Sequence, residues 1–204
     1  MVPRLECYFD YRSPFPYLAI RPVGRLAEKF GVEVEWIPIR LPGLSTYRDR
    51  PMGHTLTKRV RYIGIDVQRW ARRRGVEIRT PAALLRQVEN PPPQLLGRDH
   101  PLDTERALRG ALIAKRLGVF DAYHEATNRA LWGRGEDIAA EETLAGIVRE
   151  IGQDASSFLE SIESDEIEGE LTRLTREADD RGVFGVPAFF VRVEMVWGQG
   201  RLRF

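Results

Sequence analysis

A serine lies where a strand-like segment leads into a proline-rich helix start. Residues 4–9 (RLECYF) have the pattern of a short buried strand, and Ser13-Pro14-Phe15-Pro16 follows after a short link. Proline suits the first turn of a helix, because the N–H that it lacks would have no partner there. The N-terminus of a helix carries unpaired N–H groups and a partial positive charge, so a hydroxyl there can donate to a bound thiolate or carboxylate. The simpler alternative is that Ser13 only caps the helix.

A second candidate site is the segment Gly185-Val186-Pro187, which directly precedes the strand-like run AFFVRV. If the Val186–Pro187 bond is cis, the N–H and C=O of Val186 turn outward and can pair with a peptide-like ligand as an added strand would. The alternative is an ordinary proline at the entry to a strand.

The remaining candidates carry weaker signals. The histidines show no metal-ligand spacing, so we expect no metal site. A single cysteine, Cys7, excludes an intramolecular disulfide, and its place in a predicted buried strand favours a packing role. The tryptophans are core residues by default, although two of them could line an apolar pocket for an aromatic ligand. The histidines are His54, His100 and His124, and the two tryptophans are Trp70 and Trp132.

Composition and charge are those of an ordinary globular protein. The net charge of +1 gives no general argument for nucleic acid or an anionic membrane as a partner. Residues 58–79 hold eight basic and two acidic side chains, and residues 136–180 hold fifteen acidic and three basic ones. Such blocks are solvated helix faces or, alternatively, a basic mouth that attracts an anionic substrate. No signal-peptide pattern and no apolar run of about 18 residues is present, so we expect a cytoplasmic protein.

The first elements form a predicted β-α-β unit. A helix is predicted from Pro14, with Ser13 as N-cap, to Phe30, where Gly31 ends it. Pro22 lies inside this helix and removes the hydrogen bond to the Leu18 carbonyl. The alternation in residues 32–41 predicts a second strand, which must run parallel to the first because a whole helix separates them.

The middle of the chain is predicted to be helical and its end to be a β-hairpin. The apolar periodicity predicts helices at 58–74, 103–117, 120–132, 140–151, 155–163 and 165–181, with a long loop at 79–102. The runs AFFVRV and EMVWG then predict two paired strands. This order predicts a small sheet interrupted by a helical insertion.

Four stretches together resemble a known family: YFDYRSPFPYLA, DVQRWARRRGV, NRALWGRGED and GVFGVPAFFVRVEMVWGQGRL. They are similar to the 2-hydroxychromene-2-carboxylate isomerases and the kappa-class glutathione transferases, within the thioredoxin-fold disulfide oxidoreductases. The resemblance spans nearly the whole chain. It implies an α/β thioredoxin-like fold, with a discontinuous thioredoxin-like domain at 1–43 and 165–204 and an all-helical insertion domain at 44–164.

The resemblance implies glutathione chemistry rather than disulfide exchange. Redox relatives have Cys-Pro-x-Cys where this chain has Ser13-Pro14-Phe15-Pro16, so dithiol exchange at this site is chemically excluded. Ser13 matches the family's catalytic serine, whose hydroxyl binds the glutathione sulfur and favours the thiolate. In the isomerases this thiolate adds to an anionic aromatic pyruvate or chromene, a bond rotates, and elimination returns the cofactor.

The resemblance also implies a set of cofactor contacts. Val186 matches the residue that pairs with the cysteinyl backbone of glutathione. Asp49 and Lys58 stand nine residues apart, like the family's asparagine and lysine, and Arg59 is the alternative match if no residue is inserted before Tyr62. The implied cofactor-binding residues are Ser13, Pro14, Phe15, Asp49, Lys58, Val186, Pro187, Gln199 and Gly200.

Three departures from the family pattern bear on function. Asp49 replaces an asparagine and brings a carboxylate towards the anionic ends of glutathione. Gly200 replaces the aspartate that holds the γ-glutamyl amine in the ending Trp-Gly-(Asn/Gln)-Asp-Arg-Leu. The chain also ends at Phe204, before the family's final helix, which predicts an exposed apolar sheet face or one covered by a partner chain.

Three functions therefore compete. The first is a glutathione-dependent isomerase of aromatic catabolism, acting on an anionic aromatic substrate. The second is a kappa-like glutathione transferase or peroxidase, and the third is a non-catalytic member that binds a ligand or partner through an altered glutathione site. The departures at Asp49 and Gly200 favour the third more than the motifs alone would. A homodimer is expected from the resemblance, with neither nucleic acid nor a membrane as partner.

Overall fold

The computed structural model describes residues 3–48, 55–89 and 101–202, with only the backbone for 48, 55–61 and 86–89. No helix among these residues is both long enough and apolar enough to span a membrane. The elements in chain order are β1 (Arg4–Phe9), α1 (Pro14–Phe30), β2 (Glu33–Pro38), the 3-10 turn η1 (Leu41–Gly43), α2 (Ser45–Arg48), α3 (Thr55–Arg74), α4 (Ala82–Glu89), α5 (Glu105–Arg116), α6 (Phe120–Asn128), the π-helix η2 (Arg129–Arg134), α7 (Glu141–Glu150), α8 (Ala155–Ile162), α9 (Asp165–Asp180), β3 (Ala188–Val191), β4 (Glu194–Trp197) and the 3-10 turn η3 (Gln199–Arg201).

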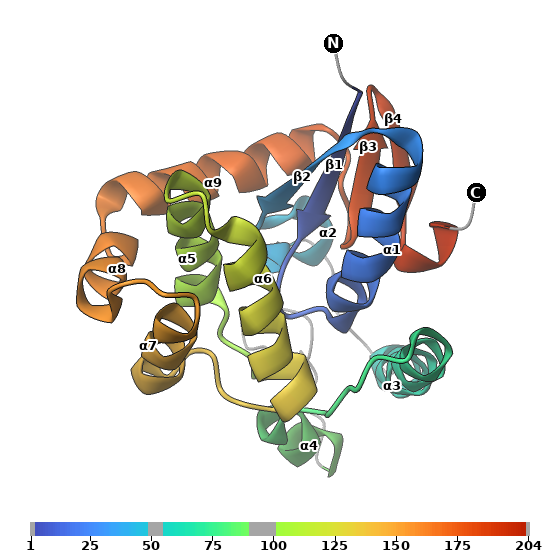
Figure 1. Cartoon of the computed structure of the whole chain (residues 1–204). Coiled ribbons are helices and arrows are strands. Elements are labelled where there is room, and N and C mark those ends of the chain that lie inside the picture. The colour runs from blue at the N-terminus through green and yellow to red at the C-terminus, as the bar shows by residue number, and fades with distance from the viewer. Residues whose placement is uncertain (1–2, 49–54, 90–100, 203–204) are drawn as a thin grey trace.

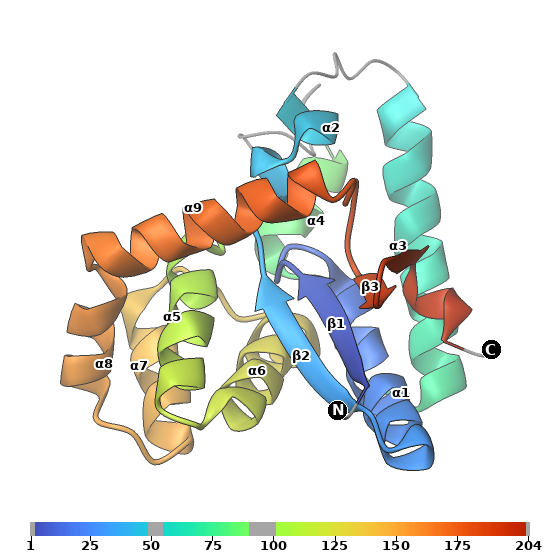
Figure 2. The same ribbon diagram turned by 90° about the horizontal axis from the view of Figure 1, so that it is seen from above.

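A mixed sheet forms the centre of the molecule. Its strand order is β2-β1-β3-β4, with β2 parallel to β1, and with β1–β3 and β3–β4 antiparallel. Alternate residues of β1 face opposite sides. Phe9 packs with α1 and with the helices that follow β2, α3–α8, which we call the helical segment. Tyr8 packs with the end of α9 at Ala178. Figures 1 and 2 show α5–α8 gathered beyond the β2 edge of the sheet, and α3 next to α1 near the opposite edge. The predicted thioredoxin-like fold is confirmed.

The helical segment shares a core with the sheet. One cluster of buried side chains runs from Phe9 of β1 to Leu108 of α5 and Ile147 of α7. This continuous packing crosses the predicted boundary between the discontinuous domain and the insertion at 44–164. The division into two domains therefore stays a prediction. Val191, Val193 and Trp197 of the β3–β4 hairpin are exposed, but Val191 and Trp197 lie on opposite faces of the sheet, so the expected apolar sheet face stays a prediction.

Helix α1 has the bounds predicted from the sequence, and its internal proline is compensated from α3. Ser13 is the N-cap, and Gly31 ends the helix with a left-handed φ of 61°. Pro22 cannot donate to the Leu18 carbonyl. The Arg74 Nη1 donates to that carbonyl instead, and the Arg74 Nη2 donates to the Gln199 carbonyl at 2.9 Å. Arg74 thus ties α1 to α3 and to the last turn of the chain.

Two predicted boundaries are wrong. The segment 79–102, predicted as a loop, contains α4, whose Ala83 and Leu84 pack against the main core. The proline run at 91–93, which suggested the loop, lies outside the described residues. The helix predicted at 120–132 ends at Asn128 and continues as a π-helix to Arg134. A π-turn has the same local apolar pattern as an α-turn, and such insertions are common near functional sites.

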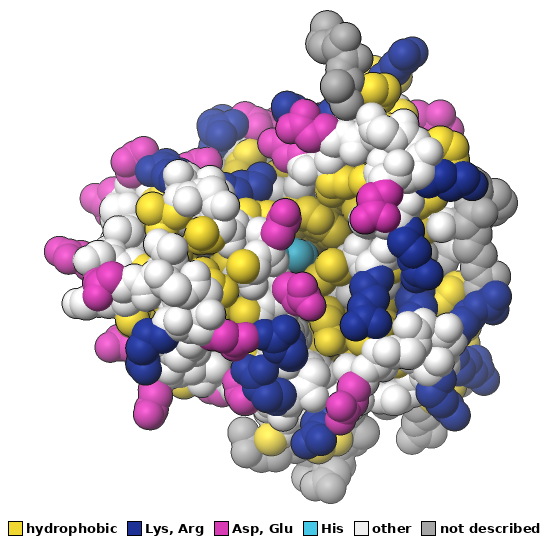
Figure 3. Space-filling view, viewed as in Figure 1, with side chains coloured by type: hydrophobic (Ala, Val, Ile, Leu, Met, Phe, Trp, Pro, Cys, Tyr) yellow, Lys and Arg dark blue, Asp and Glu magenta, His cyan; other side chains and the backbone are white. Residues whose placement is uncertain are grey.

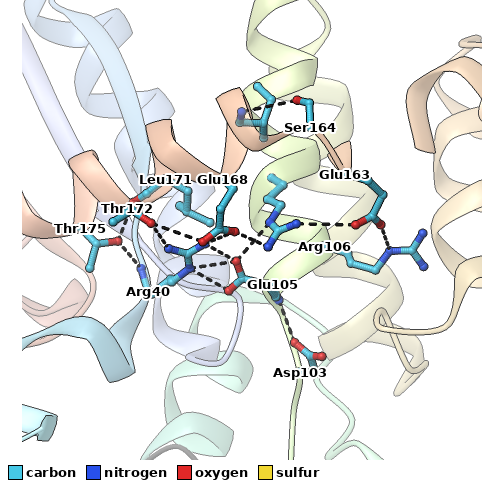
Figure 4. A network of polar contacts seen from close by, with 12 residues as sticks. Arg40, Asp103, Glu105, Arg106, Glu163, Ser164, Glu168, Leu171, Thr172 and Thr175 are labelled. Carbon is cyan, nitrogen blue, oxygen red and sulfur yellow. Dashed lines mark hydrogen bonds and ion pairs between the residues drawn. The ribbon is translucent and has the colours of Figure 1, made fainter. Parts of the chain in front are cut away.

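An ion network joins the end of β2 to α5 and α9 (Figure 4). The Arg40 guanidinium donates to Glu105 at 2.8–2.9 Å and to Glu168 at 2.8 Å, while its backbone N–H donates to Thr175 Oγ1 at 3.0 Å. Arg109 binds both glutamates from α5. Burial alone would raise the pKa of Glu105, but the hydrogen bonds and charges of Arg40 and Arg109 outweigh it and lower that pKa.

Replacing Arg40 tests this network. Arg40→Met should lower the free energy of unfolding at pH 7 by about 1–3 kcal/mol, because two part-buried carboxylates lose one of their two arginine partners. The folded-state pKa of Glu105 lies below its ordinary value of 4.5, so the network stabilises the protein above that pH and loses its effect as the pH falls. Urea unfolding at pH 7 and pH 4 measures both effects. Arg4→Met, which removes an exposed pair with Glu35, should cost below about 1 kcal/mol. If Arg40→Met loses as much unfolding free energy at pH 4 as at pH 7, the network does not act through the Glu105 charge.

Candidate functional site

A buried carboxylate fixes the loop that leads to Ser13. Asp10 follows β1 and is fully buried. Its Oδ1 accepts hydrogen bonds from the Arg12 N–H and the Thr104 hydroxyl, both at 2.9 Å, and its Oδ2 accepts one from the Leu41 N–H at 2.8 Å. Burial raises the pKa of Asp10, while the charge of Arg12 and these three hydrogen bonds oppose the rise. The loop, the end of β2 and the start of α5 therefore meet at one carboxylate.

The helical segment holds the next residue of the loop, Tyr11. Its carbonyl accepts a hydrogen bond from the Trp132 indole N–H at 2.8 Å, and its hydroxyl lies 3.2 Å from the Nδ1 of His124. Burial, with a smaller effect of the Lys115 charge, lowers the pKa of His124 to about 3, so this imidazole is neutral at physiological pH. Trp132 lies on the π-helix η2, which was not predicted from the sequence. The π-helix places the indole where it can bond to the loop. Trp132 is thus a core residue with a positioning role.

The start of α1 offers no backbone N–H for a ligand, contrary to the sequence-based expectation. A helix leaves about four N–H groups unpaired at its N-terminus. Here the Ser13 N–H donates to the Asp10 carbonyl at 3.1 Å, Pro14 and Pro16 have no N–H, and the Phe15 N–H donates to Ser13 Oγ at 3.4 Å. The partial positive charge of the helix remains, and no acidic residue lies in its first turn.

Ser13 itself keeps a hydrogen to donate. Its Oγ accepts from the Phe15 N–H, and no group among the described residues accepts its hydroxyl hydrogen. The side chain is partly exposed, so a ligand can reach it. The capping role and the donor role are therefore compatible: the oxygen caps the helix while the hydrogen points to a partner.

The sheet register brings the second candidate segment to the same place. Ala188 pairs with Tyr8, so the preceding residues, Val186 and Pro187, lie beside the loop that follows β1. The Val186–Pro187 peptide bond is cis. A Cβ on Gly185 would lie only 3.0 Å from the Trp197 indole nitrogen, which explains a glycine there. The structure thus brings together Ser13 and the Val186-Pro187 segment.

The last turn of the chain packs on α3 where the family pattern has an aspartate. A Cβ on Gly200 would lie 3.3 Å from the Trp70 ring, so even a small side chain would press on it. The guanidinium of Arg74 stacks over the same ring, 4.9 Å from its centroid. Trp70 and Phe15 pack against one small cluster, which links this turn to the start of α1. Gln199 is buried, and its Oε1 has no hydrogen-bond partner among the described residues.

Some predicted site residues lie outside what the structure describes. This holds for Asp49 and for the side chain of Lys58, whose backbone is in α3. His54 and His100, for which the sequence predicts no metal site, also lie outside the described residues. Among the described residues there is no group of three or more potential metal-binding side chains. Cys7 is fully buried, and burial raises the pKa of its thiol well above its ordinary value.

A hollow on the face shown in Figure 3 is not part of this site. It has a volume of about 530 Å³ and is lined by Glu33, Trp36, Lys115 and Phe120, among others. These residues surround the beginning of β2, where it pairs with the beginning of β1. Ser13 lies beyond the opposite end of β1.

Residues 4–204 match the DSBA-like thioredoxin domain family. The chain belongs to this family. The resemblance drawn from the four sequence stretches is thereby confirmed, as is the fold that it implied.

The most informative relatives share one name. The 2-hydroxychromene-2-carboxylate isomerase of Sphingobium xenophagum is 28% identical over 206 residues, covering 100% of this chain and 96% of that protein. The enzyme of that name from Pseudomonas sp. strain C18 is also 28% identical, covering 97% and 86%. A solved structure of a 2-hydroxychromene-2-carboxylate isomerase superimposes with a TM-score of 0.80 at 27% identity, covering 98% of this chain and 90% of the other. The cytosolic disulfide reductase DsbM of Pseudomonas aeruginosa, solved with GSH, shares the fold at 20% identity and a TM-score of 0.63, covering 95% and 88%.

The hydroxyl of Thr104 tests how the loop is held. Thr104→Val keeps the shape but leaves the buried Asp10 with one donor fewer, so the free energy of unfolding at pH 7 should fall by about 1–3 kcal/mol. Only ionised Asp10 needs that donor. Because the folded-state pKa of Asp10 is raised, the deficit should appear as the pH rises through that pKa and be smaller in acid. Urea unfolding from pH 4 to pH 7 measures it.

The matched control is Thr143→Val, on the partly exposed part of α7, where the change should stay within about 0.5 kcal/mol. A Thr104→Val deficit that is the same at both pH values would mean that the hydroxyl matters for packing and not for the Asp10 charge.

Proposed function

We propose that this chain is a glutathione-dependent isomerase of the 2-hydroxychromene-2-carboxylate isomerase type, acting on an anionic aromatic substrate. The observation that carries the proposal is the Ser13 hydroxyl at the start of α1, with its hydrogen unengaged among the described residues and no sulfur beside it. The isomerase relatives, which match almost the full chain, support the same assignment. Glutathione is the proposed cofactor.

The residues at the thiol end fit this cofactor. When bound, glutathione supplies a thiolate that adds reversibly to the conjugated carbonyl compound and so permits rotation about the former double bond. Ser13 donates its hydroxyl hydrogen to the sulfur, and the positive end of α1 favours the anionic form. Val186 offers backbone groups to the cysteinyl unit. The hydrogen bonds to Asp10 and Tyr11 keep the serine in place through the reaction.

The other end of the cofactor would be held differently from the family pattern. Gly200 supplies no carboxylate, and the Trp70 ring occupies the adjacent space. The unpartnered Oε1 of Gln199 is an acceptor that suits an ammonium group, so we assign the amine to Gln199. Asp49 and Lys58 remain proposed contacts on the resemblance alone. A homodimer is proposed on the same basis, and a cytoplasmic location is proposed as expected from the sequence.

Removing the Ser13 hydroxyl tests the proposal. Ser13→Ala should lower turnover of a chromene carboxylate, followed by its ultraviolet spectrum, by about 100-fold. Glutathione affinity, measured by calorimetry at millimolar concentrations, should change much less, because the backbone contacts persist. The lost cap should cost about 1 kcal/mol of stability, so assays are run well below the unfolding temperature.

Two control variants isolate the hydroxyl. Ser13→Thr keeps a hydroxyl and a cap and should retain far more activity, whereas Ser156→Ala, on an exposed position of α8, should behave as wild type. Absence of any heat or thermal shift with glutathione would exclude both the isomerase and the transferase. Binding without isomerisation, but with conjugation of other electrophiles, would favour the kappa-like transferase.

A further inference from the structure

The hollow at the beginning of β2 has the make-up of a ligand site, although it lies away from Ser13 (Figure 3). Its volume of about 530 Å³ is in the range of sites that hold small organic molecules. The lining is largely apolar and partly aromatic, with the side chains of Val34, Trp36, Val119 and Phe120. Because Ser13 follows the other end of β1, this hollow and the proposed isomerase site are separate places in the molecule.

Lys115 brings an amine into this hollow. Its Nζ lies 4.0 Å from Glu35 Oε1 and 5.5 Å from the centroid of the Phe120 ring. Glu35 is on β2 and Phe120 begins α6, and both line the hollow, so the amine lies between two of its walls. The Lys115 side chain is 30% exposed and belongs to the same lining, so a ligand in the hollow can touch it.

The amine of Lys115 has no hydrogen-bond acceptor among the described residues. Its distance to Glu35 is too long for a hydrogen bond. The other oxygen of that carboxylate already accepts from Arg4 at 2.9 Å. An ammonium group has three N–H donors, so its charged form is not held here by any hydrogen bond from the described chain. The group is therefore open to a ligand.

Burial also favours the neutral form of this amine. It lowers the pKa of Lys115, while the charges of Glu35 and Glu170 oppose the effect and the charge of Arg4 adds to it. The neutral amine is the nucleophile in lysine chemistry, and desolvation in an apolar pocket is a common way to make a lysine reactive. Lys115 therefore combines an accessible hollow, an aromatic wall and a nucleophilic group.

We propose that this hollow is a second site, which takes aromatic aldehydes and binds them reversibly as imines of Lys115. The ammonium group first loses a proton to solvent. The neutral amine then adds to the carbonyl carbon, and the electron pair of the C=O bond goes to the oxygen, which takes up a proton. The carbinolamine loses this oxygen as water and forms the C=N bond, so that amine and aldehyde give imine and water. The aromatic ring packs on the apolar lining. This assignment is independent of the chemistry proposed for Ser13.

Reductive trapping tests the assignment. The whole protein is incubated at pH 7 with benzaldehyde and cyanoborohydride, which converts imines into stable secondary amines, and peptide mass spectrometry gives the labelling rate of each lysine. Lys115 should be labelled about 10-fold faster than Lys29, at a rate that saturates as the benzaldehyde concentration rises. Lys29 is a matched internal control, because its amine also lies over a ring, 5.0 Å from the centroid of Phe30, but at an exposed position of α1.

Two further comparisons isolate the hollow. Propanal has no ring, so with this aldehyde the preference for Lys115 over Lys29 should be much smaller. Glu35→Gln removes a charge that favours the ammonium form, so the variant should label faster at Lys115 and unchanged at Lys29. Circular dichroism confirms that the variant is folded.

Four results would overturn the assignment. The first is equal labelling of Lys115 and Lys29 by benzaldehyde. The second is a Lys115 rate that rises linearly without saturation, because the amine would then react without a binding site. The third is an equal preference with propanal, which would remove the selection of aromatic ligands. The fourth is an unchanged Lys115 rate in Glu35→Gln, because the reactivity would then not come from the surroundings of the hollow.

Discussion

The fully buried carboxylate of Asp10 is the constraint on which the site depends. Its two oxygens accept from three segments that are otherwise far apart in the chain: the Arg12 loop, the start of the turn η1 at Leu41 and the start of α5 at Thr104. A carboxyl group at this depth is tolerated because each donor offsets part of the cost of removing it from water. The same geometry sets the direction of the chain into α1, and therefore where the Ser13 hydroxyl lies. A local feature, the capped helix start, is thus positioned by contacts that are not local.

The helical segment supports the sheet at the places where the sheet and α1 leave polar groups unpaired. The Tyr11 carbonyl has no strand partner and receives the Trp132 indole N–H. The Leu18 carbonyl, orphaned by Pro22, receives a guanidinium N–H from Arg74. In both cases a long side chain from the helices between β2 and α9 supplies the donor. These helices therefore contribute directly to the hydrogen bonding of the site.

Local chemistry could be predicted from the sequence, and long-range contacts could not. The Ser13 cap, the extent of α1 and the parallel β1–β2 pair follow from prolines, glycines and alternation over a few residues. Thr104 lies 94 residues from Asp10, and Arg74 lies 56 residues from Leu18, so no local pattern in the sequence indicates these contacts. The π-turn that ends at Arg134 has the sequence pattern of an α-helix. The prolines that follow α4 led to the prediction of a loop where α4 lies.

The replacement of sulfur by oxygen changes what this helix start can do. A hydroxyl cannot exchange electrons with a disulfide, but it donates a hydrogen bond that a thiolate accepts. The two prolines remove backbone donors that would otherwise bind any anion equally, and the capping contacts use the rest. Discrimination between anions therefore falls to the side chains of the loop. With both oxygens of Asp10 occupied, the loop is fixed, and the Ser13 hydroxyl is held at the helix start by contacts to one buried carboxylate.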